Sequence, residues 1–461
     1  MQNFYAFDTP AALNVPLMKH MNASYDSWQI QLNLLYSAYS LPNTIIPFVS
    51  GKFIQSHGVE RVLLGTSSVV LLGQMIFTAG ISNKSFPTLL LGRVIFGIGG
   101  ESVSVCQSCV VAQWFGSESQ VSLALGLTLT ISRFGSVLNS ILSPRIERSS
   151  QSVLLAVWTA TMMCVASFVC AIALVRVIRA SSDTPTDLGP GDASNEVTPL
   201  LIGPRQELEI EEQSYVQTSI GPETPQGGAP TEFWLICLLC VLLYGTIMPF
   251  NNTASDFLME KWYPNDTVTA GLVMSIPDSI STFLVPLSGF YMDVYGHRPL
   301  LLLACAVAVT FAHLALGLLD CSPIPGMITL GVAYSVYGAA IWGSIADIVA
   351  SSGSQQSVEA ESDAGEKADE GGLGRAYGIS TSIYNTSLVF LPMVAAEIHV
   401  RSGGFLWVEV FFASLGLLGV FAAFALYVLD IRGSGVLDKG SRVGGRHQSR
   451  VRIAATEAYE E

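Results

Sequence analysis

Long stretches of apolar residues recur along the chain and are separated by short polar intervals. Each stretch has roughly the 20 residues that a helix needs to cross the hydrocarbon core of a bilayer. Continuous runs of this length predict helices, because the strands of a membrane barrel are shorter and alternate between apolar and polar residues. The sequence therefore predicts an all-α membrane protein with eleven complete spans, near residues 28–51, 62–81, 86–114, 119–143, 151–178, 232–256, 268–292, 299–320, 324–350, 373–398 and 404–430.

The first residues of the chain, 1–13, form a shorter apolar segment that reads as the second half of a span. Counted as an incomplete first span, it brings the total to twelve and divides the spans into six and six. We expect either a shortened first helix or a gene model that starts late.

A proline-rich and acidic interval, 179–231, separates the two groups of spans. Its composition cannot bury enough apolar surface to fold, so we expect a disordered linker. The predicted organisation is one helix bundle over 1–178 and a second over 232–430, with an acidic loop at 351–372 and a polar tail at 431–461. Only 13% of the residues are charged, against about 25% in soluble domains. The net charge of −14 comes from the polar intervals and says little about partners.

Two loops in equivalent places of the two halves share a local repeat. Both have the order Gly, three residues, a polar residue, two residues, Gly and then Arg. The first copy has Gly51, Gln55, Gly58 and Arg61, and the second has Gly289, Asp293, Gly296 and Arg298. Glycine permits a tight turn, and the carboxylate of the second copy can engage an arginine or a helix end and latch one conformation. Gln55 removes that charge from the first copy.

Two opposite charges lie deep inside successive spans, Glu101 and Arg133. An ionisable group at such a depth costs about 2.5–3.5 kcal/mol or more, so each must face water, a partner or a substrate. One interpretation is a permanent buried ion pair. The other is a site that holds a solute with separated charges, the carboxylate binding an ammonium group and the guanidinium binding a carboxylate. The termini of a dipeptide, about 5–7 Å apart, suit such a pair.

Other polar residues within spans are weaker candidates. For Arg93 two interpretations stand equally: a structural or gating role, and a contact with the substrate. Asp278 could add cation selectivity or face a water-filled cleft, and Asp347 is expected to be solvated near a span end. For His313 the favoured interpretation is a packing histidine. Three tyrosines could form aromatic walls, with ordinary packing as the alternative for each: Tyr244, Tyr334 and Tyr337.

The repeated loop resembles the signature of the major facilitator superfamily, and its second copy matches better than its first. Within that superfamily the chain resembles one family, the major facilitator superfamily domain-containing protein 1 family, whose members are lysosomal dipeptide uniporters. The matching segments cover nearly all the spans and include 5–13, 92–102, Trp114-Phe115, 133–136 with Asn139, Tyr334-Ser335, Trp342, 376–378 and 408–412.

This resemblance implies export of dipeptides, including cationic ones, from the lysosome to the cytosol. It also implies a glycosylated single-span accessory protein as partner. By the same resemblance Glu101 binds the peptide amine, Arg133 binds the peptide carboxylate, and Asp8 and Trp342 correspond to further family residues. Asn139 is expected to add a polar contact, and Tyr334 to contribute to an aromatic wall.

The distribution of basic residues predicts that both termini are cytosolic. The linker then carries an acidic dileucine pattern on the cytosolic side, formed by Glu196, Leu200 and Leu201. Such a pattern is typical of binding sites for sorting adaptor proteins, which agrees with a lysosomal, endosomal or vacuolar membrane.

The favoured hypothesis is an alternating-access dipeptide uniporter whose partners are a small solute and the lipid bilayer. Two alternatives remain: a proton-coupled or facilitative transporter of another organic solute such as a sugar, and a non-transporting membrane sensor or scaffold. No nucleophile–base constellation or metal-ligand spacing points to an enzyme, a cofactor or a metal. Nucleic acid is not expected as a partner.

Overall fold

The computed structural model describes residues 1–46, 53–54, 56–115, 121–182, 230–359, 365–433 and 435–439. These residues are almost entirely helical, which confirms the predicted fold class. The helices are α1 (Gln2–Ala12), α2 (Asn14–Met21), α3 (Tyr25–Asn43), α5 (Val59–Ser82), α6 (Phe86–Phe115), α7 (Val121–Ser150), α8 (Val153–Ser182), α9 (Thr231–Lys261), α10 (Thr267–Met274), α11 (Ile276–Tyr295), α12 (Arg298–Leu318), α13 (Ile324–Glu359), α14 (Gly365–Ser402) and α15 (Leu406–Arg432).

Two of the membrane segments are interrupted. α1 and α2 meet at Leu13, and α10 and α11 meet at Ser275. A proline follows each break, Pro16 in α2 and Pro277 in α11. Since proline has no N–H to bond the carbonyl four residues earlier, the helix is interrupted at these points. The first segment, α1 with α2, reaches Met21 and is longer than the half-span expected from residues 1–13.

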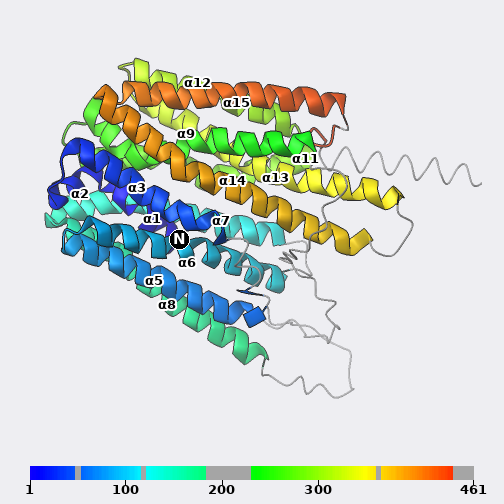
Figure 1. Cartoon of the computed structure of the whole chain (residues 1–461), viewed down its shortest axis with the longest axis horizontal. Helices are drawn as coiled ribbons and strands as arrows, with labels where there is room; N and C mark the ends of the chain where they lie inside the picture. The colour runs from blue at the N-terminus through cyan, green and yellow to red at the C-terminus, as the bar shows by residue number, and fades with distance from the viewer. Residues whose placement is uncertain are drawn as a thin grey trace, which may run out of the picture.

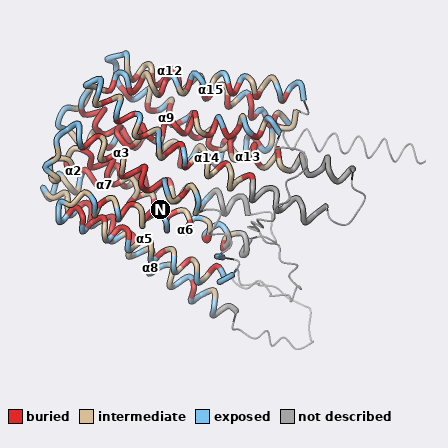
Figure 2. The backbone as a smooth tube through the Cα atoms, in the orientation of Figure 1, coloured by how far each residue is buried: buried red, intermediate tan, exposed pale blue. Residues whose placement is uncertain are grey.

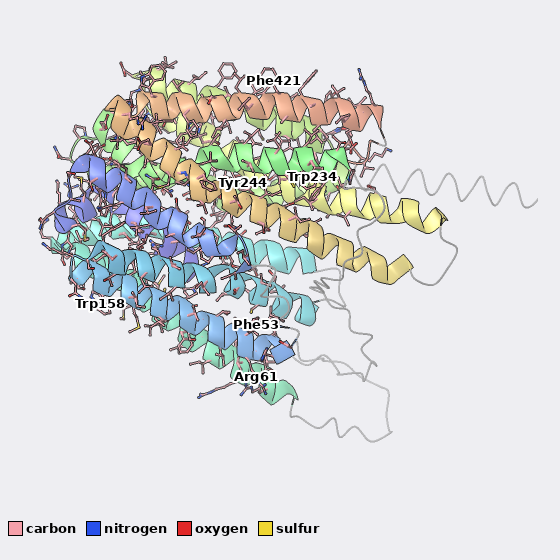
Figure 3. The ribbon with its side chains drawn as sticks, viewed as in Figure 1. Phe53, Arg61, Trp158, Trp234, Tyr244 and Phe421 are labelled. Atoms are coloured by element: carbon pink, nitrogen blue, oxygen red, sulfur yellow. The ribbon has the colours of Figure 1, made fainter. Side chains whose placement is uncertain are left out.

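Nine helices of the described part of the chain are long and apolar enough to cross a membrane. α3, α7 and the α1–α2 segment do not meet this criterion, and each of them contacts helices of the second half of the chain. Figure 2 shows buried residues along the facing sides of the helices and exposed ones along the outer sides. Figure 3 shows Trp158 and Phe421 pointing outward and Tyr244 inside. Phe421 is 64% exposed, as expected for a side chain in contact with lipid.

The helices form two bundles that lie side by side, α1–α8 and α9–α15 (Figure 1). Contacts between the halves fall mainly on α3 against α14 and on α7 against α11. We call the end where α8 ends and α9 begins the linker end, and the opposite end the turn end. Toward the linker end, α5 and α8 diverge from α12 and α15 (Figure 1).

Polar contacts join the two halves at the turn end. The Tyr25 hydroxyl donates to Asp256 at 2.8 Å and lies 3.1 Å from His399 Nε2. Arg148 forms an ion pair with Asp266 at 2.9 Å. The halves are therefore closed against each other at this end.

Glycines set the close packing of α5 against α6. A Cβ atom on Gly73 would lie 2.4 Å from the backbone nitrogen of Phe96, and one on Gly92 would lie 2.5 Å from that of Phe77. No real side chain fits at these distances. The glycine-rich stretch that ends in Glu101 thus brings two helix backbones together, as in small-residue contacts of other membrane helices.

The interval expected to form an acidic loop, 351–372, is partly helical. α13 continues to Glu359 and α14 begins at Gly365. The start of the tail is also ordered: the backbone N–H groups of His297 and Arg298 donate to the carbonyls of Asp438 and Leu437. The rest of the tail and the linker between Ser182 and Pro230 lie outside the described residues.

Candidate functional site

A cavity lies between the two halves and is lined by both. Its lining comes from α1, α3, α6 and α7 in the first half and from α9, α11, α13 and α14 in the second. The lining residues are mostly aromatic or polar, namely Asn3, Phe4, Phe7, Asp8, Tyr36, Tyr39, Ser40, Glu101, Ser104, Arg133, Ser136, Met248, Asn251, Asn252, Asp278, Tyr334, Tyr384, Asn385, Leu388 and Pro392. Four of the six predicted substrate contacts are among them: Asp8, Glu101, Arg133 and Tyr334.

Glu101 enters the cavity from α6. Its carboxylate accepts a hydrogen bond from the Tyr39 hydroxyl at 3.3 Å. Glu101 and Arg133 form no ion pair with each other in the part of the chain that the structure describes. The alternative of a buried pair between these two side chains is therefore not what the structure contains, and both line the same cavity.

Arg133 enters the cavity from α7 and contacts the other half. Its guanidinium carbon lies 4.2 Å from the centre of the Tyr334 ring, which is within the range of a cation–π interaction. Its Nη1 donates to Ser281 Oγ at 3.4 Å. The side chain is 8% exposed, and its Nε has no hydrogen-bond partner among the described residues. Arg133 thus keeps donor capacity for a ligand while touching both halves.

Arg93 lies behind α1 and is not part of the cavity lining. It is fully buried, and its Nη2 donates to the carbonyl oxygens of Ala6 at 3.3 Å and Phe7 at 3.1 Å. Four aromatic rings surround its guanidinium: Phe7, Tyr36, Phe77 and Phe96. This arrangement fixes the turn of α1 that presents Asp8 to the cavity, so a structural role explains Arg93 better than a substrate contact.

Two predicted contacts lie outside the lining. Asn139 is fully buried, and its Oδ1 accepts hydrogen bonds from Thr9 at 3.1 Å and Ser143 at 2.7 Å. It joins α7 to α1 instead of facing a solute. Trp342 donates from Nε1 to the Tyr244 hydroxyl at 3.0 Å. It supports the aromatic wall from behind, while Tyr334 forms part of its surface.

Neutral polar residues complete the cavity, and none of them was predicted as a contact from the sequence. Asn251 and Asn252 come from α9, two and three residues after Pro249, and Asn385 comes from α14. The side-chain oxygen of Asn251 is buried and has no partner among the described residues. The sequence signal that could have identified these residues was an amide side chain within an otherwise apolar span.

The two copies of the repeated loop share a positive φ at their second glycine but differ in their contacts. Gly58 and Gly296 both have φ of +80°, which glycine adopts without strain. Arg298 forms ion pairs with Asp293 at 3.0 Å and Asp347 at 3.1 Å. Asp347 is therefore paired, contrary to the expectation that it is simply solvated.

In the first copy, Arg61 is exposed and forms no hydrogen bond or ion pair with the described residues; Figure 3 shows it at the outer edge of the bundle. Gly289 has open space around its Cα. Gly51, together with the sorting pattern Glu196, Leu200 and Leu201, lies outside the described residues.

His313 makes a specific buried contact instead of only packing. Its Nδ1 lies 2.8 Å from Glu409 Oε2, and both side chains are at most 1% exposed. The pair joins α12 to α15 within the second half and is remote from the cavity lining.

Two bundles of membrane-spanning helices around a shared polar cavity define a multi-pass transporter. The sequence profile of the Major Facilitator Superfamily matches residues 4–358, and the chain belongs to this superfamily. The fold agrees with solved transporters at low identity. A nucleoside transporter NupG variant superposes with a TM-score of 0.61 at 10% identity, covering 92% of this chain and 98% of that one. The human organic anion transporter MFSD10 gives 0.59 at 15% identity, with coverages of 92% and 96%.

Among curated proteins, the chain resembles the lysosomal dipeptide transporter MFSD1. The protein of that name from Danio rerio is 28% identical over 95% of this chain and 86% of its own length. The Homo sapiens protein is 26% identical over 95% of this chain and 86% of its own length. The resemblance found from the sequence is thereby confirmed.

Proposed function

We propose that this protein is an alternating-access uniporter for dipeptides. Glu101 binds the amino terminus of the peptide and Arg133 binds its carboxylate. The observation that carries the proposal is that these two charges line one cavity without pairing with each other. A zwitterion with separated termini offers an opposite charge to each of the two side chains, whereas an uncharged solute such as a sugar offers a charge to neither.

The same cavity contacts explain how binding couples to movement. Arg133 touches Ser281 and Tyr334 of the second half. A peptide carboxylate that engages Arg133 competes with these contacts between the halves. A ligand shifts a conformational equilibrium only through such differential contacts, and rocking of two halves around a central site is the usual form of transport in this architecture.

We further propose that both termini are cytosolic and that the membrane is lysosomal. The names of the curated relatives and the dileucine pattern support this location. In that orientation the turn end, where the halves are closed, faces the lumen. The protein would work with a glycosylated accessory protein and with sorting adaptors, and co-purification of such a partner from lysosomal membranes tests this part of the proposal.

Binding and transport by the purified protein test the main proposal. Thermal-shift titrations with Ala-Ala, alanine and glucose should show stabilisation by the dipeptide. Uptake of Ala-Ala into proteoliposomes should proceed without a pH gradient, as a uniporter requires. Glu101→Gln and Arg133→Ala should each lower the uptake by at least about 100-fold, the loss of a charged hydrogen-bonded contact of roughly 3 kcal/mol.

Asp320→Asn is the matched control, because the Asp320 side chain is 98% exposed and outside the cavity lining. It removes one carboxylate without touching the site, and its uptake should equal that of the unmodified protein. Stabilisation by glucose alone, or retained uptake by both cavity variants, would overturn the dipeptide assignment. Absence of any transport with intact binding would favour a sensor.

A further inference from the structure

The charges that line the cavity do not balance for a simple dipeptide. The lining has three carboxylates, Asp8, Glu101 and Asp278, and one guanidinium, that of Arg133. If the proposed function holds, the peptide amine takes Glu101 and the peptide carboxylate takes Arg133. The peptide backbone then has no further cation for the other two carboxylates, Asp8 and Asp278.

Asp8 and Asp278 differ in what compensates them. Asp8 lies within electrostatic reach of Arg93, the fixed arginine behind α1, as well as of Arg133. The described cation that acts on Asp278 is Arg133. A bound peptide carboxylate would neutralise Arg133, so Asp278 would lose its partner at the moment of binding while Asp8 would keep Arg93.

The position of Asp278 directs its carboxylate toward a ligand. It lies in the first turn of α11, three residues after the break at Ser275. Its side chain forms no hydrogen bond or ion pair with any residue that the structure describes, although it lines the cavity. One turn further along α11, Ser281 contacts Arg133, so Asp278 is near the place where the peptide carboxylate would bind.

We propose that Asp278 is a subsite for a cationic side chain, an ammonium or guanidinium group, on the C-terminal residue of the transported dipeptide. The inference rests on the proposed function. The C-terminal residue carries the carboxylate that Arg133 binds, so its side chain is the one that starts closest to Asp278. Peptides with lysine or arginine in the second position should be preferred over those with lysine in the first.

The test compares dissociation constants of Ala-Lys, Lys-Ala and Ala-Ala for the full-length protein and for Asp278→Asn. The unmodified protein should bind Ala-Lys more tightly than Lys-Ala. Asp278→Asn should weaken Ala-Lys by about tenfold or more, the value of one charge-assisted contact. It should not weaken Ala-Ala, because that peptide has no side-chain cation for Asp278 and the variant leaves Arg133 without a competing carboxylate. Asp278→Glu, which keeps the charge, should retain the preference for Ala-Lys, and Asp320→Asn should retain all three constants.

The outcomes separate this inference from the proposed function. If the unmodified protein binds none of the three peptides, the proposed function itself fails. If it binds them but Asp278→Asn weakens Ala-Ala and Ala-Lys equally, or neither, the subsite is wrong while dipeptide transport stands. A third result would also overturn the inference. A pH gradient would stimulate uptake by the unmodified protein but not by Asp278→Asn, and the ratio of the Ala-Lys and Lys-Ala dissociation constants would be the same in both proteins. Asp278 would then carry a proton instead of binding a side chain. A variant that fails to fold is recognised by size-exclusion chromatography, and Asp278→Glu then decides the question.

Discussion

The two halves of the molecule have the same architecture but hold themselves together in different ways. In the first half, the outer helices α5 and α8 are joined by a buried hydrogen bond between two hydroxyls, Thr78 and Thr161, at 2.8 Å, and near the linker end by a more exposed ion pair of Arg179 with Glu60 at 2.8 Å. In the second, the corresponding helices α12 and α15 are joined by the buried contact of His313 with Glu409. The repeated loop follows the same division, since Arg298 is tied by two carboxylates and Arg61 by none of the described residues.

The cavity reverses this asymmetry. The first half supplies Asp8, Glu101 and Arg133, whereas the second supplies neutral amides, tyrosines and the single carboxylate of Asp278. The buried ionic contacts thus lie within the second half, whereas the ion pair inside the first half is exposed and its buried charges line the cavity. We infer that the second half is the more rigid of the two and that the first half supplies most of the charged contacts to the solute. Single substitutions can test this difference.

The largest effect is expected when the buried pair of the second half is broken. His313→Leu would leave the Glu409 carboxyl group buried without its hydrogen-bond partner, which costs about 1–3 kcal/mol and more if the group is charged. The thermal unfolding temperature in detergent should fall clearly. The double variant with Glu409→Met should recover part of the loss, because a pair replaced by apolar side chains leaves no orphan group. An unchanged unfolding temperature for His313→Leu would show that the pair contributes nothing to stability.

The second effect concerns transport rather than stability. Arg298→Ala removes both ion pairs of the repeated loop, and Asp293 and Asp347 would then repel each other without a cation between them. We expect dipeptide uptake to fall by about tenfold, equivalent to roughly 1.4 kcal/mol, with dipeptide affinity unchanged because the loop is outside the cavity lining. Arg298→Lys should restore part of the rate. A loss of affinity equal to the loss of rate would mean that the loop shapes the site itself.

Much of this arrangement follows from the sequence alone. The spans were predictable because a bilayer leaves a chain few ways to satisfy its backbone. Glu101 and Arg133 were found because a charge deep in an apolar span is costly unless it faces a cavity. Neutral amides cost less, so Asn251 and Asn385 gave a weaker indication and were missed.

Helix rotation explains why two of the predicted contacts lie outside the cavity lining. Asn139 follows Arg133 by about 1.7 turns of helix, so it points to another face and bonds to Thr9 of α1. Trp342 was assigned by resemblance, and its hydrogen bond to Tyr244 turns it behind the cavity wall. The partner of His313 lies far along the chain on another helix, so no local pattern could identify Glu409.

A smaller effect is expected from the corresponding contact of the first half. Thr78→Val keeps the shape of the side chain and removes its hydrogen bond to Thr161. Hydrogen bonds between membrane helices contribute about 0.6 kcal/mol on average, so the unfolding temperature should fall much less than for His313→Leu. The matched variant Thr161→Val should give the same small change, and the two together should not add. A loss as large as that of His313→Leu would remove the proposed difference in rigidity between the halves.

The smallest effect is expected at the first copy of the repeated loop. Arg61 is exposed and unpaired within the described residues, so Arg61→Ala removes no hydrogen bond or ion pair to any of them. Uptake should fall by no more than about twofold, less than 0.5 kcal/mol, whereas Arg298→Ala at the equivalent position should cost several times more. Measured side by side in proteoliposomes, the two arginines test whether the ionic latch belongs to one half. Equal losses would show that Arg61 finds a partner in another state of the transport cycle, and the latch would then alternate between the halves instead of residing in the second.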